Sequence, residues 1–502
     1  MIRRDFCKTS LALAGLTLRS RGANALLGPA EALAAAPAEE LAKAPGLTKY
    51  CAEFIVNTKY EDIPQDVIAT GKKTILDGFG LALAGSVSKS GPLIRQYVES
   101  LGPCGGKATV IGTKMKTHPR FAALANGNSI HADDYDDTGS AMHVTGPTLP
   151  PAFGLCEVGN RSGKDLMLAF HLGVEVADKI GEAVSPRHQR EGYHTTGTIG
   201  SFSSAIACAK LRGLDAPKTA VAMAIAASQA SGLRDNFGSM TKPFHAGHAG
   251  ESGSAAADLA AIGWTAAGDI LEAPLGFFQV GGGFDPKIIV GKLGNPWMFI
   301  APGDLIKRFP CGTIQQQVMD EMLRLIDKNN IRAADVAKVE VAGNQSNWET
   351  LFRHHPVNSL MAKFSMEFAV AILLLDRKAT LSTFTDEVVL RPDVQDLIAR
   401  VRYYADPEFD KLTKQGASLQ LVLVEQSQVK IFMKDGKVIT GVTLPAKGSP
   451  ENPMTYEEVA DKFRGNAEFA KWPKQKADVI IEIVKSLENE RDMSRLTAAL
   501  TA

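Results

Sequence analysis

Two stretches built almost entirely from small residues, GSFSSAIACAKLRG (residues 200–213) and GESGSAAADLAAIG (residues 250–263), indicate how this chain folds. Glycine and alanine at helical spacing let helix axes approach closely, which suits a compact bundle. Apolar residues recur every three to four positions in the segments around them, residues 68–83, 121–135, 166–183 and 219–230. The first part of the chain, residues 46–300, is therefore predicted to be a helical domain.

The pattern changes after residue 307. The segments VAKVEV (residues 336–341) and SLQLVLV (residues 418–424) are typical of strands, and apolar residues alternate on both sides of a Lys-Asp-Gly turn within residues 429–442. Two helical patterns, residues 315–329 and 365–375, lie in the same region. Residues 301–445 are therefore predicted to form a smaller α+β domain.

A further helical stretch begins near the C-terminus, where Thr455 is predicted as the N-cap and Glu458 as its capping-box partner. Because helices flank the α+β segment on both sides, residues 446–502 are expected to return to the first domain. The predicted fold is mainly α. It has a large all-helical domain formed by both ends of the chain and a smaller α+β lid domain.

The first 36 residues differ from the rest of the chain. Arg3 and Arg4 precede Phe6 and Lys8, a weakly apolar run follows at residues 9–18, and small residues then offer cleavage sites. This order is typical of a twin-arginine signal peptide followed by an Ala-rich linker. The mature protein is therefore expected in the periplasm, or in the cytoplasm if the N-terminus is not a functional signal.

Composition argues against several classes of protein. The 55 Lys and Arg residues balance the 55 Asp and Glu residues, so a nucleic-acid partner, which requires a basic surface, is not expected. No apolar run approaches the roughly 20 residues of a membrane-spanning helix, so no membrane contact is expected beyond export. The six cysteines contain no CxxC pair, which indicates neither a disulfide framework nor a zinc site.

The stretch HADDYDDTGSAMH (residues 131–143) packs four carboxylates, three hydroxyls and two imidazoles into thirteen residues. It is consistent with a divalent-metal cage, a proton-transfer site or a solvated acidic turn. If residues 121–137 form one helix, then His131, Asp134 and Thr138 share a face, and His143 returns on the following loop. Those groups can give and take protons. The other aspartates can cap neighbouring helices or face water.

The metal interpretation has a specific form, because DDYDD (residues 133–137) matches the DDxxD magnesium-diphosphate motif of terpenoid synthases. Such enzymes need a second metal motif far downstream, and the sequence offers none. Histidines and cysteines never gather at metal-ligand spacing, and neither GxxxxGK[ST] nor a GxGxxG after a strand is present. These absences argue against a P-loop or Rossmann nucleotide site and leave the metal interpretation with little support, so no cofactor is expected.

The cationic groups gather in a second stretch, LRDNFGSMTKPFHAGHAGESG (residues 233–253), which contains Arg234, Lys242, His245 and His248. A loop that leads into a glycine-rich helix is predicted here, so that Lys242 and the free N–H groups of the helix form a site for carboxylates. His194 precedes a comparable helix start. Lys307 lies at the entrance to the lid domain, where it can reach a cleft between the domains. Such a cleft suits proton abstraction or elimination on a small polycarboxylate.

From about residue 47 to the C-terminus, the chain resembles the MmgE/PrpD family of 2-methylcitrate dehydratase and cis-aconitate decarboxylase. The resemblance is carried, in order, by NGNSIHADDYDDT, HVTGPTLPPAF, HTTGTIGS, SGLRDNFGSMTKPFHAG, LIKRFPCG, AKFSMEF and KGSPENPMTYEE. It implies a large helical domain built from both chain ends, a smaller lid domain, usually a homodimer, and a metal-free active site in the cleft between the domains.

The resemblance also implies a set of active-site positions, which correspond in this sequence to Asp134, Thr138, His143, His194, Lys242 and Lys307. One position departs from the family pattern. The family usually has a histidine six residues beyond the proline of the lid-entry motif, and this sequence has Gln316 there. Glutamine cannot exchange protons, so the reaction can differ from dehydration.

The resulting hypothesis is a cofactor-independent lyase or isomerase that acts on a small di- or tricarboxylate similar to 2-methylcitrate or cis-aconitate, by dehydration, decarboxylation or epimerisation. His143 is the leading general acid or base, and Asp134 and Thr138 orient it or a leaving hydroxyl. The substrate carboxylates and the developing enolate-like charge are held by Arg234, Lys242, Lys307 and His194. The alternatives are an exported carboxylate-binding protein without turnover and, more distantly, a magnesium-dependent diphosphate enzyme that uses residues 133–137.

Overall fold

The computed structural model of this 502-residue chain describes residues 46–102, 105–410 and 426–502. The predicted signal peptide and linker, and the strand predicted at residues 418–424, lie outside the described residues. Everything below concerns the described part of the chain.

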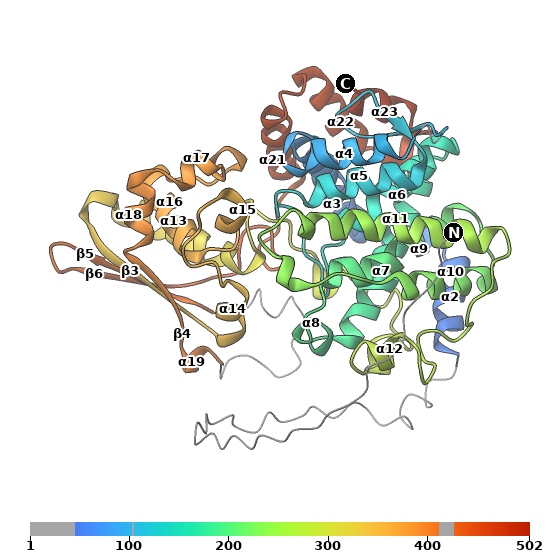
Figure 1. Ribbon diagram of the computed structural model, residues 1–502, viewed down its shortest axis with the longest axis horizontal. Helices are drawn as coiled ribbons and strands as arrows, with labels where there is room; N and C mark the ends of the chain where they lie inside the picture. Colours follow the sequence, from blue (N-terminus) through green and yellow to red (C-terminus); the bar gives the residue numbers. More distant parts are fainter. Residues whose placement is uncertain (1–45, 103–104, 411–425) are drawn as a thin grey trace, which may run out of the picture. The chain divides into compact units, whose positions relative to one another are not determined.

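Helices dominate the described residues, so the mainly α fold is confirmed (Figure 1). The helical segments predicted around residues 68–83, 166–183 and 219–230 fall within α3, α7 and α10. The helices before residue 300 are α2 (Leu47–Asn57), α3 (Gln65–Val87), α4 (Ser90–Ser100), α5 (Pro119–His131), α6 (Thr145–Val158), α7 (Gly163–Val184), α8 (Arg187–Arg190), α9 (Thr195–Leu211), α10 (Ala216–Gln229), α11 (Thr241–Ala261) and α12 (Phe277–Val280), with the short pair β1 (Ala108–Thr109) and β2 (Lys116–Thr117) between α4 and α5.

The small residues of the two opening stretches allow α9 and α11 to pack at short range, as predicted. A Cβ atom at Gly253 of α11 would overlap the backbone nitrogen of Ala205 in α9. On another side of the same helix, a Cβ at Gly247 would overlap the carbonyl oxygen of Leu124 in α5. Helix α11 is therefore held between α5 and α9 at distances that only glycine permits.

The same close approach joins α3 to α5 and gives a stability prediction. A Cβ atom at Gly85 would overlap the carbonyl of Ser129, so Gly85→Ala is expected to destabilise the fold by about 1–3 kcal/mol or more. The matched control is Gly465→Ala, because Gly465 is an exposed helical residue with no atom within 4 Å of the added methyl group. That change should stabilise the helix by about 0.5–1 kcal/mol. Thermal unfolding of both variants tests this, and equal melting temperatures would contradict it.

The C-terminal helices return to the first helices of the chain. They are α21 (Tyr456–Phe469), α22 (Lys474–Lys485) and α23 (Ser494–Leu500), and α21 and α22 pack on α3 (Figure 1). The predicted capping box at Thr455 and Glu458 is confirmed, since the Thr455 side chain accepts the Glu458 N–H and the Glu458 carboxylate accepts the Thr455 N–H. One hydrophobic core joins residues from α2 through residue 306 with residues 454–500.

The remaining part of the chain has its own hydrophobic core and a four-stranded sheet in the order β4-β3-β5-β6. The strands are β3 (Val336–Gly343), β4 (Val401–Ala405), β5 (Gln428–Met433) and β6 (Val438–Val442). Strand β4 runs parallel to β3, and the other pairs are antiparallel. The predicted strand at residues 336–341 and the predicted hairpin are both confirmed. The helices of this part are α13 (Gln316–Asn329), α14 (Gln345–Thr350), α15 (Ser359–Ala362), α16 (Met366–Asp376), α17 (Asp386–Val389), α18 (Pro392–Ile398) and α19 (Pro407–Asp410).

The α+β part meets the helical part at residues 133–138. A short β-bridge pairs Thr138 with Leu305, and the buried Lys363 ammonium donates to the carbonyl oxygens of Asp133 (2.8 Å) and Pro310 (3.3 Å). The acidic stretch of the sequence therefore lies where the two parts join.

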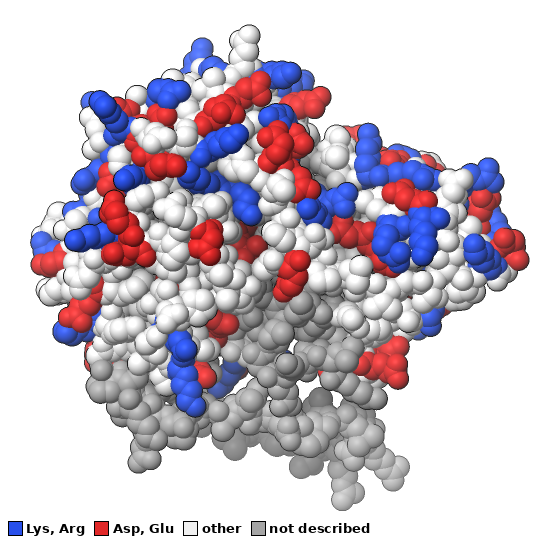
Figure 2. Space-filling view, turned by 180° about the vertical axis from the view of Figure 1, so that it is seen from behind, with Lys and Arg blue, Asp and Glu red and all other residues white. Residues whose placement is uncertain are grey.

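On the surface, basic and acidic side chains are interspersed over the face shown in Figure 2. None of the helices in the described ranges combines the length and the apolar character that crossing a membrane requires.

Candidate active site

A cavity of about 770 Å³ opens between the helical part and the α+β part. Six of the seven residues predicted for the site line it: Asp134, Thr138, His143, His194, Arg234 and Lys242. The α+β part contributes a wall that includes Gly312, Thr313, Asn347 and Phe364. The residues singled out from distant parts of the sequence are thus brought to one cavity.

The single helix expected over residues 121–137 is wrong. Helix α5 ends at His131, and the acidic residues follow in turns and bends. Asp134 adopts a positive φ of 51°, a left-handed conformation that helical residues do not adopt and that aspartate tolerates better than most residues. The reason lies in tertiary contacts, because the four carboxylates reach four different partners that a regular helix could not bring within their range.

Three of the aspartates have structural partners. The Asp133 carboxylate accepts a hydrogen bond from Ser88 and forms an ion pair with Lys363 at 3.4 Å. The Asp137 carboxylate accepts the N–H groups of Val144 (3.0 Å) and Thr145 (3.3 Å) at the start of α6. Asp137 therefore caps a neighbouring helix, as the sequence allowed. The third, Asp136, pairs with the imidazole of His131 at 2.8 Å.

Asp134 is buried between two lysines. Its Oδ1 accepts a hydrogen bond from Lys242, and Lys307 lies 3.2 Å from the same oxygen and 3.0 Å from the Asp134 carbonyl. Burial by itself would raise the pKa of Asp134, but these two lysines outweigh it and hold that pKa well below 3.8. One carboxylate is thus shared by two ammonium groups, and the Asp136 carboxylate acts on both of them at longer range.

Lys242 was expected in a loop before the helix. It lies instead in the first turn of α11. Its side chain is nevertheless at the cavity, where its ammonium group lies 5.2 Å from the ring centre of Phe237 and 5.4 Å from that of Phe364. Burial lowers the pKa of Lys242 below 10.5, although Asp134 opposes the shift. A buried lysine with only half a counter-ion is suited to bind a carboxylate.

Two imidazoles at the ends of the acidic stretch have defined tautomers. The Nδ1 of His143 lies 2.7 Å from the carbonyl oxygen of Asp137, and a carbonyl only accepts, so Nδ1 carries the proton. The Nδ1 of His131 lies 2.8 Å from the Asp136 carboxylate, whose pKa is held below its usual range, so this Nδ1 also donates. In both rings the Nε2 atom then carries a lone pair, which is the form of a base.

His194 precedes α9 as its N-cap residue, which agrees with the predicted helix start. Its Nδ1 lies 3.0 Å from the Nδ1 of His245, which comes from the first turns of α11. The Nε2 of His194 is buried and has no hydrogen-bond partner among the described residues. His194 therefore keeps Nδ1 in contact with a second imidazole and leaves Nε2 without a hydrogen-bond partner among the described residues.

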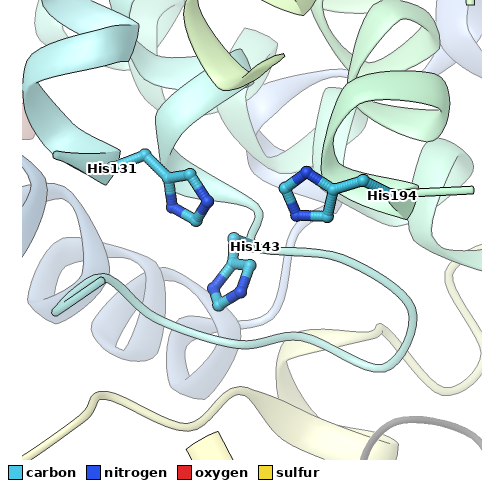
Figure 3. A group of neighbouring side chains, drawn as sticks. All are labelled: His131, His143 and His194. Carbon is cyan, nitrogen blue, oxygen red and sulfur yellow. The ribbon is translucent and has the colours of Figure 1, made fainter. Parts of the chain in front are cut away.

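The three histidines of Figure 3 lie close enough to raise the question of a metal ion, since one nitrogen from each lies within 4.8 Å of the others. In Figure 3 the rings of His131 and His194 face each other, while the ring of His143 points away from both. The Nδ1 atoms of His131 and His143 are already donors. Chelation by all three rings would need His143 to turn, so the absence of a metal stays a prediction. In a second group, His131 with Asp134 and Asp136, the side chains already have partners: His131 and Asp136 pair with each other, and Asp134 pairs with Lys242.

The two remaining predicted residues, Arg234 and Lys307, differ in their position relative to the cavity. Arg234 lines the cavity and bridges its walls, since it donates to the Gln189 carbonyl (3.0 Å) and to the Thr350 hydroxyl (3.1 Å). Lys307 is fully buried behind Asp134 and is not part of the cavity lining. It therefore supports Asp134 and does not contact the cavity directly.

Gln316 also lies behind the cavity. Its Oε1 accepts the N–H groups of Arg308 (3.1 Å) and Phe309 (3.0 Å), and its Nε2 donates to the Phe309 carbonyl (3.0 Å). The side chain thus clamps the loop that carries Lys307. Replacing a histidine by glutamine here changes the support of that loop and removes no acid or base from the cavity lining.

Thr313 is a residue of the site that the sequence did not indicate. It comes from the α+β part and lies 2.9 Å from the Thr138 hydroxyl, a contact with no signature in either segment. His131 and His245 were named with their clusters but were not assigned to the site, although His245 follows Lys242 by three residues on one helix and so shares its face. The pairing of His131 with Asp136 required the turn after α5, which the expected longer helix concealed.

Comparisons with known proteins identify the family of this chain. The MmgE/PrpD N-terminal domain matches residues 49–287, and the MmgE/PrpD C-terminal domain matches residues 309–489. Human cis-aconitate decarboxylase is 28% identical over 90% of this chain and 94% of its own length. Cis-aconitate decarboxylase of Aspergillus terreus is 29% identical over 91% of this chain and 96% of its own. The two domain matches together cover most of the sequence, and the chain therefore belongs to the MmgE/PrpD family.

Proposed function

We propose that the protein is a cofactor-independent lyase that acts on a small di- or tricarboxylate, with decarboxylation of cis-aconitate as the first candidate reaction. The observation that carries the proposal is the combination, in one cavity, of Lys242, which shares the Asp134 carboxylate with Lys307, and histidines whose pKa is lowered. The names of the relatives support cis-aconitate as the first substrate to test. Dehydration of a 2-methylcitrate-like hydroxy acid is the next candidate.

The positive side of the cavity suits a polyanion. Lys242 and Arg234 both line it, and the Asp134 carboxylate only partly compensates Lys242 because it also pairs with Lys307. A substrate carboxylate can bind Lys242 as a further anionic partner. The same ammonium group stabilises the negative charge that develops on the carboxylate as a neighbouring carbon loses a proton or CO2.

The histidines of the cavity are the groups suited to transfer protons. His143 presents an unprotonated Nε2 because its Nδ1 donates to a carbonyl, so it is suited to remove the proton from carbon that a dehydration or an epimerisation requires. A decarboxylation requires a proton donor instead. In a decarboxylation, the bond to the departing carboxylate breaks, its electron pair forms the new double bond, and the old double bond takes up a proton as CO2 leaves. Thr138 and His194 flank the same cavity and can orient the substrate or deliver that proton.

The experiment is a substrate panel with the purified full chain. Cis-aconitate, 2-methylcitrate and citrate are incubated with the protein, with and without a chelator, and the products are identified by proton NMR. We expect turnover of one of these acids that the chelator does not affect. Saturable binding of an acid without any product would identify the carboxylate-binding protein instead, and turnover that the chelator abolishes would favour a magnesium enzyme.

The lowered pKa values predict the pH profile of kcat/KM. Burial and the charges of Lys307 and Lys242 lower the pKa of His143 well below 6.5, against the opposing effect of Asp136. The base is therefore lost only as the pH falls through this lowered value, and kcat/KM should stay constant from pH 8 down past about 6.5. On the alkaline side, Lys242 should lose its proton below its ordinary value of 10.5. An acid limb centred near 6.5 would show that the active imidazole is not the buried one.

A further inference from the structure

The contact between His194 and His245 couples the tautomers of the two rings. The two Nδ1 atoms lie 3.0 Å apart, and two lone pairs or two N–H groups cannot face each other at this distance. One Nδ1 must therefore donate to the other. If His245 donates, the remaining proton of neutral His194 is on Nε2. If His194 donates, its Nε2 carries a lone pair.

We propose that His194 and His245 form a two-imidazole proton relay, in which His245 sets whether His194 presents a proton or a lone pair to the cavity. This use of the pair in turnover rests on the proposed function, while the tautomer coupling itself does not. His245 does not line the cavity, so it is a positioning residue that acts through His194.

The location of the two rings fits such a relay. His194 lies at the cavity, and its Nε2 is buried without a partner among the described residues. The His245 ring packs against Gly232, where a Cβ would lie only 3.3–3.5 Å from ring atoms. Gly232 lies between Ser231 and Leu233, which are exposed on the surface, and its carbonyl accepts the His194 N–H at 3.0 Å. A single surface loop therefore separates His245 from solvent.

The electrostatic surroundings explain why a relay is needed. Burial lowers the pKa of His194 well below 6.5. The neighbouring groups Lys242, His131, His245 and His143 lower that pKa further. His245 faces His131, Lys242 and His248 as well as His194, and burial together with these groups lowers its pKa to about 4. Neither ring is an imidazolium at neutral pH. A neutral His194 can donate from Nε2 only in one tautomer, and the pair supplies that tautomer without a net charge.

The proton balance closes without another reagent. The Nε2–H bond of His194 breaks and its proton goes to the substrate carbon. The Nδ1 proton of His245 moves to the Nδ1 of His194, and a proton from solvent binds the Nε2 of His245. After product release, water in the open cavity returns a proton to the Nε2 of His194, and the pair shifts back as His245 releases its proton to solvent.

The test replaces His245 by asparagine, whose amide occupies the position of Nδ1 and keeps a hydrogen bond to His194 but cannot pass a proton on. We expect His245→Asn to lower kcat by about 100-fold with KM nearly unchanged, and added imidazole to restore part of the rate. The matched control is His118→Asn at the opposite end of α5 from His131, which should keep the wild-type rate. Wild-type kcat in His245→Asn, or a loss that imidazole does not restore and that leaves the pH profile unchanged, would overturn the relay.

A second measurement needs no substrate. In protein with 15N-labelled histidine, assigned with His194→Gln and His245→Asn, the relay predicts that the Nδ1 resonances of both rings report one shared proton and that His245→Asn fixes His194 in a single tautomer. If His194 keeps its tautomer mixture and titration after His245 is replaced, the relay is wrong. If this coupling is present but no acid is turned over, the proposed function fails and the tautomer coupling stands.

Discussion

Replacing Asp134 by asparagine is expected to lower kcat/KM by about 100-fold and to cost about 3–5 kcal/mol in the free energy of unfolding. The variant leaves Lys242 and Lys307 buried with their shared negative charge removed, and an uncompensated buried charge is strongly destabilising. Asparagine suits the test because it has almost the same shape and tolerates the left-handed backbone of this position. Thermal unfolding and steady-state kinetics measure the two effects.

The matched control for this prediction is Asp461→Asn. Asp461 also forms an ion pair, with Arg464 at 2.7 Å, but its side chain is 70% exposed. Solvent screens this pair, so its loss should change stability by no more than about 0.5 kcal/mol. If Asp134→Asn is as stable as Asp461→Asn, the lysine pair is not held by a buried carboxylate, and the charge argument for substrate binding fails with it.

Replacing His143 by asparagine is expected to lower kcat by 10² to 10⁴-fold with little change in stability. The asparagine amide can keep the donation that Nδ1 now makes to the Asp137 carbonyl, so the loop after the acidic stretch retains its anchor. What is removed is the Nε2 lone pair at the cavity. Binding of the substrate should persist, because the lysine and the arginine are unchanged, and calorimetric titration measures it.

The comparison variant for His143→Asn is His143→Gln, which places an amide close to the Nε2 position and loses the anchor to the carbonyl. Both variants should be slow, but only His143→Gln should also unfold at a lower temperature. Full turnover in either variant would show that another group is the base, and His194 would then be the next residue to replace.

Much of the fold could be read from local sequence patterns. The Gly/Ala stripes of α9 and α11, the capping box at Thr455, and the hairpin of β5 and β6 each depend on neighbours in the sequence, and each is present. The end of α5 at His131 could not be read in this way. The residues after it satisfy partners as distant as Lys242, Lys307 and Lys363, and these tertiary contacts override the helical periodicity.

The candidate site shows the same division. Asp134 and Lys242 could be selected from the sequence because each lies in a stretch dense in charged and imidazole side chains. Whether Lys307 faces the cavity or supports Asp134 depends on which side of one carboxylate it approaches, and the sequence contains no information on that. The role of Gln316 was likewise not predictable, because its shortest hydrogen bonds are to backbone atoms.

The most direct test of the central claim, proton transfer to or from a carbon beside a carboxylate in this cavity, is proton NMR of cis-aconitate incubated with the full chain in deuterated water. The account predicts one carbon-bound deuteron in each product molecule with the wild-type protein. Product formed without carbon-bound deuterium, or bound acid that neither reacts nor exchanges, would contradict it.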